Sequence, residues 1–231
     1  MKLFIDTGSV SEVEEIAAWG VLSGATTNPS LLAKEDGGDP AASIRRICEL
    51  VDGPVSAEVV SDDARSMVAE GRALAGLDDR IVVKVPFSAD GLAATRELAS
   101  DGIPVNETLV FSAAQALLTV EAGATYVSCF MGRLDDIAVN SEEVLAEIIG
   151  ALGPDREAQV LAASLRHPVH AVTAARLGAD VATIPGKVLK AMLSHPLTDA
   201  GIAKFASDWE SRPEFGEWLH GLVGESATAS R

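Results

Sequence analysis

Short runs rich in valine, isoleucine and threonine alternate along the chain with longer stretches in which apolar residues recur every three or four positions. The short runs predict β-strands and the longer stretches predict amphipathic helices, because the two side-chain periods differ. Strands that alternate with helices in this way usually lie parallel in one sheet. The predicted strands cover residues 3–6, 24–27, 55–60, 81–86, 104–110, 125–130, 159–163 and 180–184.

Eight strand and helix units predict a (β/α)8 barrel, a single-domain α/β fold whose usual length is close to the 231 residues of this chain. Ser11 with Glu14, and Ser112 with Gln115, have the spacing of capping boxes at helix starts. Three further helices are predicted over residues 187–194, 198–209 and 214–222. We therefore expect residues 1–223 to form a barrel with a C-terminal helical extension, and residues 224–231 to form a flexible tail.

Charge and composition narrow the possible partners. The chain has 18 Lys and Arg against 34 Asp and Glu, a net charge of 18 − 34 = −16, which argues against nucleic acid as a ligand. An anionic small molecule would need a few locally placed cations. No run approaches the roughly 18 apolar residues of a membrane helix, and Cys48 and Cys129 lack disulfide-framework or metal-ligand spacing. We expect a cytoplasmic protein with reduced cysteines and no membrane contact.

One charged residue interrupts an apolar strand, and it is the first candidate for chemistry. Lys84 lies in the run Ile-Val-Val-Lys-Val-Pro at residues 81–86. A buried ammonium is costly unless it is paired or loses its proton. The residue therefore either extends its head to solvent along a packed stem or is kept neutral as a nucleophile.

Polar residues recur at the carboxyl ends of the predicted strands, where (β/α)8 barrels carry their chemistry. Some have purely structural alternatives: Asp6 and Asn28 could be turn or N-cap residues, and Asn106 and Thr108 could form hydrogen bonds with other side chains inside the barrel. Glu58 is harder to explain structurally, because a carboxylate among valines requires a cation or a functional water. The candidates at these strand ends are Asp6, Asn28, Glu58, Lys84, Asn106, Thr108, Ser128, Ser164 and Arg166.

Two arginines are the best candidates for binding an anion. Arg166, with Ser164, precedes a predicted helix start at Pro168, and Arg133 follows the sixth strand. Guanidinium groups and a hydroxyl near a helix N-terminus suit a phosphate group. Alternatively, Arg133 pairs with one of the two aspartates that follow it. His167 and His170 have no third ligand at a suggestive spacing, so we expect no metal site.

Seven segments together resemble the transaldolase family, in its short bacterial and archaeal type. The two most specific are Thr-Thr-Asn-Pro-Ser at residues 26–30 and Val-Lys-Val-Pro at residues 83–86. The resemblance extends from the first strand to the seventh, and His-Pro-Leu-Thr at 195–198 continues it. The other segments are residues 4–7, 55–59, 106 with 108–112, 132–136 and 162–166.

The resemblance implies a Schiff-base enzyme without a cofactor, acting on sugar phosphates in the non-oxidative pentose phosphate branch. Lys84 would form an imine with a ketose, Asp6 would take the proton of the C4 hydroxyl, and Glu58 with Thr108 and a water would move protons while the imine forms and breaks. A dihydroxyacetone unit would then pass to an aldose phosphate. The residues implied to bind substrate are Thr26, Asn28, Asn106, Ser128, Phe130, Arg133, Ser164 and Arg166.

Two other functions stay open. Fructose 6-phosphate aldolase, from the same superfamily, releases free dihydroxyacetone; it resembles this chain except for a glutamine at the strand 3 glutamate and a tyrosine after strand 6. Here these residues are Glu58 and Phe130, which favours transaldolase. The second possibility is a non-catalytic barrel that binds a sugar phosphate, because a fold alone does not prove its chemistry.

The resemblance also implies a homo-oligomer, with the decamer as one form that short transaldolases take. Trp209, Phe215 and Trp218 in the predicted extension are compatible with it, although they could pack on the chain's own barrel instead. Three residues depart from the family pattern and carry no evident role: Glu107, Cys129 and Gly186. Strand alternation predicts that Glu107 faces away from Asn106, toward the layer of helices.

Overall fold

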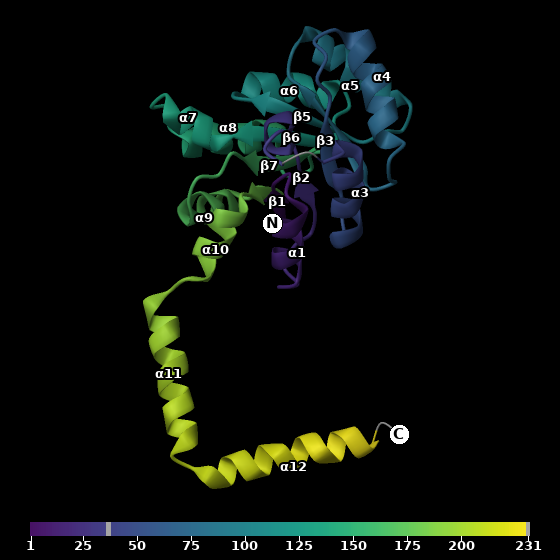
Figure 1. Cartoon of the computed structure of the whole chain (residues 1–231). Coiled ribbons are helices and arrows are strands. Elements are labelled where there is room, and N and C mark those ends of the chain that lie inside the picture. Colours follow the sequence, from purple (N-terminus) through teal and green to yellow (C-terminus); the bar gives the residue numbers. More distant parts are fainter. Residues whose placement is uncertain (36–37, 230–231) are drawn as a thin grey trace. The chain divides into compact units, whose positions relative to one another are not determined.

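The computed structural model describes residues 1–35 and 38–229. Its strands form a closed barrel in which each strand pairs parallel with the next and the last pairs with the first (Figure 1). The predicted (β/α)8 fold is therefore confirmed. The strands are β1 (Lys2–Asp6), β2 (Ala25–Thr26), β3 (Val55–Glu58), β4 (Ile81–Pro86), β5 (Val105–Val110), β6 (Tyr126–Phe130), β7 (Gln159–Ala163) and β8 (Val181–Ile184).

Helices follow the strands and surround the barrel. The barrel helices α1 to α9 all lie between two strands, and α10 follows the last one. Their bounds are α1 (Val10–Ala17), α2 (Pro29–Leu32), α3 (Pro40–Leu50), α4 (Ala64–Ala75), α5 (Ala89–Ser100), α6 (Ala113–Glu121), α7 (Met131–Asp136), α8 (Ser141–Leu152), α9 (Pro168–Leu177) and α10 (Gly186–Leu193).

The capping predictions have different outcomes. Ser112 caps α6 as predicted: its hydroxyl accepts from the amide of Gln115, and the Gln115 side chain in turn accepts from the amide of Phe111. The prediction for Ser11 is wrong. Helix α1 begins at Val10 after Ser9, so Ser11 lies within the first turn and caps nothing. An ambiguity of one or two residues is expected at helix boundaries.

The barrel interior changes from apolar to polar along the strands. Phe4, Val82, Tyr126 and Val181 belong to a small buried cluster inside the barrel, in which the rings of Phe4 and Tyr126 meet edge to face at 6.3 Å. Alternate residues of a strand face the same side. Two positions further toward the carboxyl ends, the same faces therefore carry Asp6, Lys84, Ser128 and Thr183.

A second and larger apolar core lies between the strands and the surrounding helices. Cys48 belongs to it, as its helical spacing with Ile44 and Ile47 predicts, and both cysteines are buried and free. Burial raises the pKa of the Cys48 thiol to about 11 and that of Cys129 to about 12. Both thiols are thus protonated and unreactive at neutral pH.

The chain divides into two compact units, Met1–Ala191 and Met192–Arg231. The second contains α11 (Pro196–Glu210) and α12 (Pro213–Ala229), and Trp209 contacts Phe215 within it at 5.5 Å between ring centroids. Helix α12 continues through residues for which the sequence predicts a tail, and residues 230–231 lie outside the described part. That the extension and the barrel form one domain stays a prediction. None of the described helices is long and apolar enough to cross a bilayer.

Candidate active site

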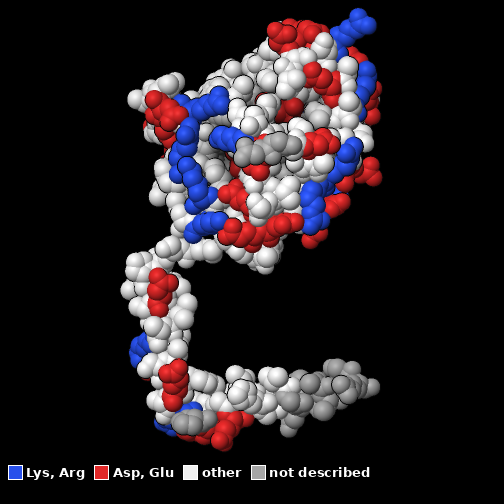
Figure 2. Space-filling model, viewed as in Figure 1, with Lys and Arg blue, Asp and Glu red and all other residues white. Residues whose placement is uncertain are grey.

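A cavity of about 280 Å³ opens at the carboxyl ends of the strands. Its volume suits a small, polar ligand. Five cationic side chains and one carboxylate line it, and Figure 2 shows basic side chains gathered around the barrel face in view, on a surface that otherwise has many acidic groups. The lining residues are Asp6, Thr26, Asn28, Leu31, Lys34, Lys84, Ser128, Phe130, Arg133, Ala163, Ser164, Leu165, Arg166, Thr183, Pro185 and Lys187.

Lys84 does not reach bulk solvent, because only 4% of its surface is exposed. The alternative of a solvated head is therefore wrong. Its ammonium lies 2.9 Å from a carboxylate oxygen of Glu58 and donates to the carbonyl of Thr27 at 3.2 Å. Lys84 and Glu58 face each other because their strands pair in register at these two residues. The ion pair offsets the desolvation free energy that either charge would cost if it were buried alone.

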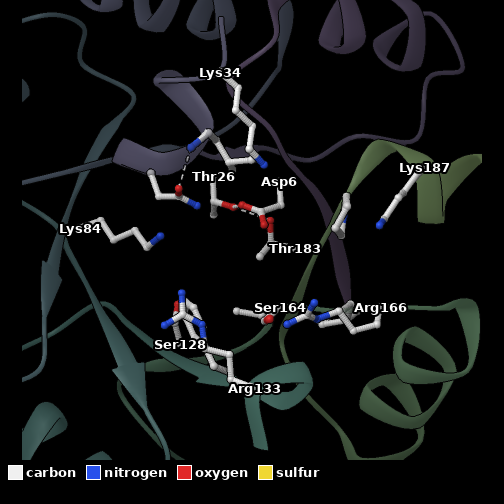
Figure 3. Close-up of a pocket in the computed structure, with 16 residues that line it drawn as sticks. Asp6, Thr26, Lys34, Lys84, Ser128, Arg133, Ser164, Arg166, Thr183 and Lys187 are labelled. Carbon is white, nitrogen blue, oxygen red and sulfur yellow. Dashed lines mark hydrogen bonds between the residues drawn. The ribbon is translucent and has the colours of Figure 1, made fainter. Parts of the chain in front are cut away.

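Asp6 sits in the middle of the cavity floor, beside Thr26 and Thr183 (Figure 3). The Thr26 hydroxyl donates to its carboxylate at 2.8 Å, and the Thr183 hydroxyl lies 2.6 Å from that of Thr26. Because Thr26 uses its only proton on Asp6, Thr183 is the donor in the second bond. Burial raises the pKa of Asp6, while the Lys84 ammonium and the Thr26 hydrogen bond act in the opposite direction.

The two asparagines have structural roles as well as places near the cavity. Asn28 caps α2, since its side chain accepts from the amide of Leu31 at 2.9 Å, and it also lines the cavity. Asn106 is fully buried; it donates to the hydroxyl of Ser56 at 3.0 Å and accepts from Ser128 at 2.6 Å. The structural alternatives for both residues are therefore correct, although they do not exclude contact with a ligand.

Thr108 is held at an irregular point of β5. The pairing of β5 with β6 shifts between Glu107 and Val110, and Leu109 has a positive φ of 63°. The Thr108 hydroxyl is buried and has no hydrogen-bond partner among the described residues. A buried hydroxyl without a partner is a natural binding point for water or ligand.

The predicted anion site is brought together by one glycine. The amide of Gly132 donates to the carbonyl of Ser164, and a Cβ at Gly132 would lie 2.1 Å from that oxygen and 2.5 Å from Nε of Arg166. Only glycine therefore lets α7 approach the loop after β7. As a result Arg133, Ser164 and Arg166 line one cavity.

The sequence left open that Arg133 pairs with one of the two aspartates that follow it. The structure shows other partners for these aspartates. Arg166, not Arg133, pairs with Asp136, at 2.8 Å and on the surface. Asp135 instead accepts from Nε2 of His170, whose other ring nitrogen accepts from the amide of Arg166. Arg133 has no ion pair with a described residue; its guanidinium lies over the ring of Phe130, 5.2 Å from the centroid. Arg133 is thus available to bind an anion.

Comparisons with known proteins agree with this geometry. The family model described as Transaldolase/Fructose-6-phosphate aldolase matches residues 3–214. The chain belongs to this family. A probable transaldolase of Caldicellulosiruptor saccharolyticus is 51% identical over 216 residues, which cover 93% of this chain and 99% of that protein. A probable transaldolase of Thermus thermophilus is 52% identical over 219 residues, which cover 91% of this chain and 98% of that protein.

Most of the residues that family resemblance implicates lie together. Glu58 lines a recess that adjoins the main cavity and shares Asn28, Lys84, Phe130 and Arg133 with it. Asn106 is one hydrogen bond away through Ser128, and Thr108 lies on the same strand as Asn106 without lining either space. The implicated residues thus occupy one end of the barrel, around Lys84.

Sequence reasoning missed Lys34, Thr183 and Lys187. Thr183 could have been found, because it lies two residues beyond Val181 on the interior face of β8. Lys34 follows α2 and Lys187 lies in the first turn of α10, so no strand periodicity marks them. Their side chains reach the cavity from outside the barrel strands.

The three departures from the family pattern do not line this cavity. Gly186 leaves space for Glu12, whose carboxylate oxygen lies 2.2 Å from where a Cβ at residue 186 would be. Cys129 is buried in the outer core. Glu107 is fully buried too, and neither of its carboxyl oxygens has a hydrogen-bond partner among the described residues.

Proposed function

We propose that this protein is a transaldolase, which transfers a dihydroxyacetone unit from sedoheptulose 7-phosphate or fructose 6-phosphate to glyceraldehyde 3-phosphate or erythrose 4-phosphate. One observation carries the proposal: the buried Lys84 ammonium touches Glu58 and faces the same cavity as Asp6. A nucleophile, a proton acceptor beside it and a second base are the groups that Schiff-base chemistry needs. The names of the relatives support the same activity.

The first stage forms the imine. Lys84 gives a proton to Glu58, with which it is already in contact, and its free amine attacks the C2 carbonyl of the ketose. Glu58 returns this proton to the C2 oxygen, takes a second one from the nitrogen of the resulting carbinolamine, and delivers it to the same oxygen, which then leaves as water and gives the protonated imine. A water held between Glu58 and the unpartnered hydroxyl of Thr108 relays these protons and later hydrolyses the imine. Each proton that Glu58 takes is thus given back within the cycle.

The second stage breaks the C3–C4 bond. Asp6 takes the proton of the C4 hydroxyl, C4 becomes an aldehyde, and the electron pair of the broken bond moves into the imine to give an enamine on Lys84. Burial raises the pKa of Asp6, which makes it a stronger base than an exposed aspartate. The aldose phosphate leaves, a different one enters, and the same steps in reverse form the new ketose.

The remaining residues hold the substrate in this scheme. Arg133, Ser164 and Arg166 bind the phosphate group from the wall that Gly132 brings together. Asn28, Ser128 and Asn106 bind hydroxyls of the three-carbon unit near Lys84. Phe130 borders the site, since both Arg133 and the Lys84 ammonium lie over its ring, the latter 5.9 Å from the ring centroid.

Fructose 6-phosphate aldolase is the second candidate, because the matching family includes both activities. A product assay separates them. With fructose 6-phosphate and erythrose 4-phosphate together, a transaldolase forms glyceraldehyde 3-phosphate and sedoheptulose 7-phosphate in equal amounts. With fructose 6-phosphate alone, it releases little free dihydroxyacetone. Release without acceptor at the rate of transfer would show that the protein is the aldolase, and a Lys84→Met variant gives the background for both rates.

The assembly and the location belong to the same proposal. Large apolar side chains such as Leu197, Ile202 and Phe205 lie on the surface of the C-terminal unit, and surfaces of this kind usually pack against a partner. We expect a homo-oligomer, with a decamer as one possible form, in the cytoplasm. Light scattering at several protein concentrations measures the mass, and a constant monomer mass would contradict this part of the proposal.

A further inference from the structure

The cavity contains more positive charge than one phosphate group needs. Lys84 is occupied by Glu58, and Arg133 and Arg166 form the phosphate wall with Ser164. Two cations remain, Lys34 and Lys187. Neither lies within 4.0 Å of an acidic group of a described residue, although acidic residues outnumber basic ones by 34 to 18 in the chain. These unpaired lysines are therefore a feature that the proposed mechanism does not explain.

The two lysines approach one part of the cavity from different elements. Figure 3 shows Lys34 and Lys187 entering the cavity from two different sides of Asp6, whereas Arg133, Ser164 and Arg166 lie along another edge of the cavity. Lys187 lies in the first turn of α10, at the end where the helix dipole favours an anion. Glu12 packs against the preceding residue, Gly186, yet it makes no ion pair with Lys187.

The proposed reaction gives this second group of cations a purpose. When C2 is bound to Lys84 and the C4 hydroxyl lies at Asp6, the position of the phosphate depends on the length of the sugar. The two arginines already have neighbours at the arginine wall, since Arg133 lies over Phe130 and Arg166 is paired with Asp136 on the surface. Lys34 and Lys187 are both exposed at the cavity mouth, and lysine side chains are flexible enough to follow a phosphate that lies further out.

We propose that Lys34 and Lys187 form a second phosphate position at the mouth of the cavity, which takes the phosphate group of the longer, seven-carbon ketose phosphates. The arginine wall then takes the phosphate of six-carbon ketoses. This assignment rests on the proposed transaldolase function and adds a determinant of substrate length to it. Because the reaction cleaves one ketose and builds another, a protein with both positions can bind the donor and the product without rearranging the barrel.

A kinetic comparison tests the role in chain length. In a Lys34→Gln/Lys187→Gln variant, we expect kcat/KM for sedoheptulose 7-phosphate to fall about tenfold to a hundredfold through KM, as for the loss of charge-assisted hydrogen bonds. For fructose 6-phosphate the change should stay within about threefold, the size of a surface electrostatic effect. Lys190→Gln, on the same helix and paired with Glu15, is the matched control. Equal losses for both ketoses, or no loss, would overturn the proposal.

A second experiment tests phosphate binding without any turnover. The lysines are labelled with an amine-reactive reagent in inorganic phosphate or in chloride of the same ionic strength, and the labelled positions are identified by mass spectrometry. We expect phosphate to slow the labelling of Lys34 and Lys187 several-fold and to leave Lys190 unchanged. An Arg133→Gln/Arg166→Gln variant should keep this protection, because the second position does not use the arginines.

The two experiments separate the possible failures. Absence of protection at Lys34 and Lys187 would overturn the second phosphate position even if the protein transfers dihydroxyacetone. Protection that disappears in the arginine variant would also contradict it, since the lysines would then only border the arginine site. If borohydride traps no adduct on Lys84, the transaldolase function fails, whereas the protection result still decides whether phosphate binds at the mouth.

Discussion

Two glutamates are shielded from solvent on neighbouring parts of the barrel, and their surroundings are opposite. Glu58, inside the barrel on β3, has a side chain that is 12% exposed and lies 2.9 Å from the Lys84 ammonium. Glu107 belongs to β5, and its side chain lies on the outer, helix-covered face of that strand. It is fully buried and has no hydrogen-bond partner among the described residues. A buried carboxylate can stay charged beside a cation, but without one it binds a proton. The barrel thus confines its buried charges to the cavity.

The environment of Glu107 supports this difference. Burial raises its pKa to about 7. Thr95, and Thr119 on α6, are themselves buried with unpartnered hydroxyls. Glu107 has no ion pair with any described residue, in contrast to Glu58, which the strand register places opposite Lys84.

Replacement of Lys84 should have the largest effect. It removes the nucleophile and leaves Glu58, like Glu107, without a cation beside its carboxyl group. A Lys84→Met variant cannot form an imine, and we expect its transfer activity to fall by about 10⁴ or more. The uncompensated Glu58 should also lower the free energy of unfolding by about 3 kcal/mol at neutral pH. Coupled transfer assays and urea unfolding measure the two effects, and Lys190→Met is the control. Transfer by the purified variant well above about 10⁻⁴ of the wild-type rate would contradict the assignment.

Neutralising Glu58 as well should separate stability from activity. In Lys84→Met/Glu58→Gln the unpaired charge is gone, so we expect most of the lost unfolding free energy to return while activity stays absent. Glu58→Gln alone keeps the nucleophile but loses its proton acceptor, and its kcat should fall about 10²–10³-fold. If the double variant is no more stable than Lys84→Met, the ion pair is not what stabilises this part of the barrel.

Glu107 should make the free energy of unfolding depend on pH. Its folded pKa of about 7 lies above the ordinary value of 4.5, so the unfolded state loses this proton at lower pH than the folded state. The wild-type protein should therefore be about 3 kcal/mol less stable at pH 8 than at pH 4.5 on account of this group. Glu107→Gln should lack this decrease. Urea unfolding at several pH values measures it, with Glu121→Gln as an exposed control; identical pH slopes in wild type and Glu107→Gln would refute the account.

Replacement of Thr26 should have the smallest of these effects, a change in the pH dependence of activity. Its hydrogen bond lowers the pKa of Asp6, so Thr26→Val should raise that pKa. The acidic limb of the pH profile of kcat/KM should therefore move to higher pH. Thr183→Val, which leaves the bond between Thr26 and Asp6 in place, should move it less. A shift to lower pH in Thr26→Val would contradict the role of Asp6 as the base.

The fold and most of the candidate site could be predicted from the sequence. Strand periodicity placed Asp6, Lys84 and Ser128 at the carboxyl end of the barrel interior, because each lies two residues beyond an apolar interior position. The period of a strand does not show which side chains extend into the cavity from helices and loops. Lys34 and Lys187 approach the cavity from outside the strands, and only tertiary structure brings them there.

The sequence also did not determine which charged side chains pair with one another. A carboxylate in a strand predicts that a cation is needed, yet only the strand register identifies Lys84 as the partner of Glu58. The opposite outcome at Glu107 depends on the helices that cover β5. The pairing of Asp136 with Arg166 in place of Arg133 has the same cause, because it depends on how Gly132 packs against the loop after β7.

Chemical trapping of the intermediate tests the central claim most directly. The protein is treated with sodium borohydride in the presence of fructose 6-phosphate, digested and analysed by mass spectrometry. We predict one reduced three-carbon adduct per chain, on Lys84, and none on Lys34, Lys187 or Lys190. The adduct should be absent from Lys84→Met and present at reduced rate in Glu58→Gln. An adduct on another lysine, or none on wild type that is otherwise active in transfer, would contradict the account.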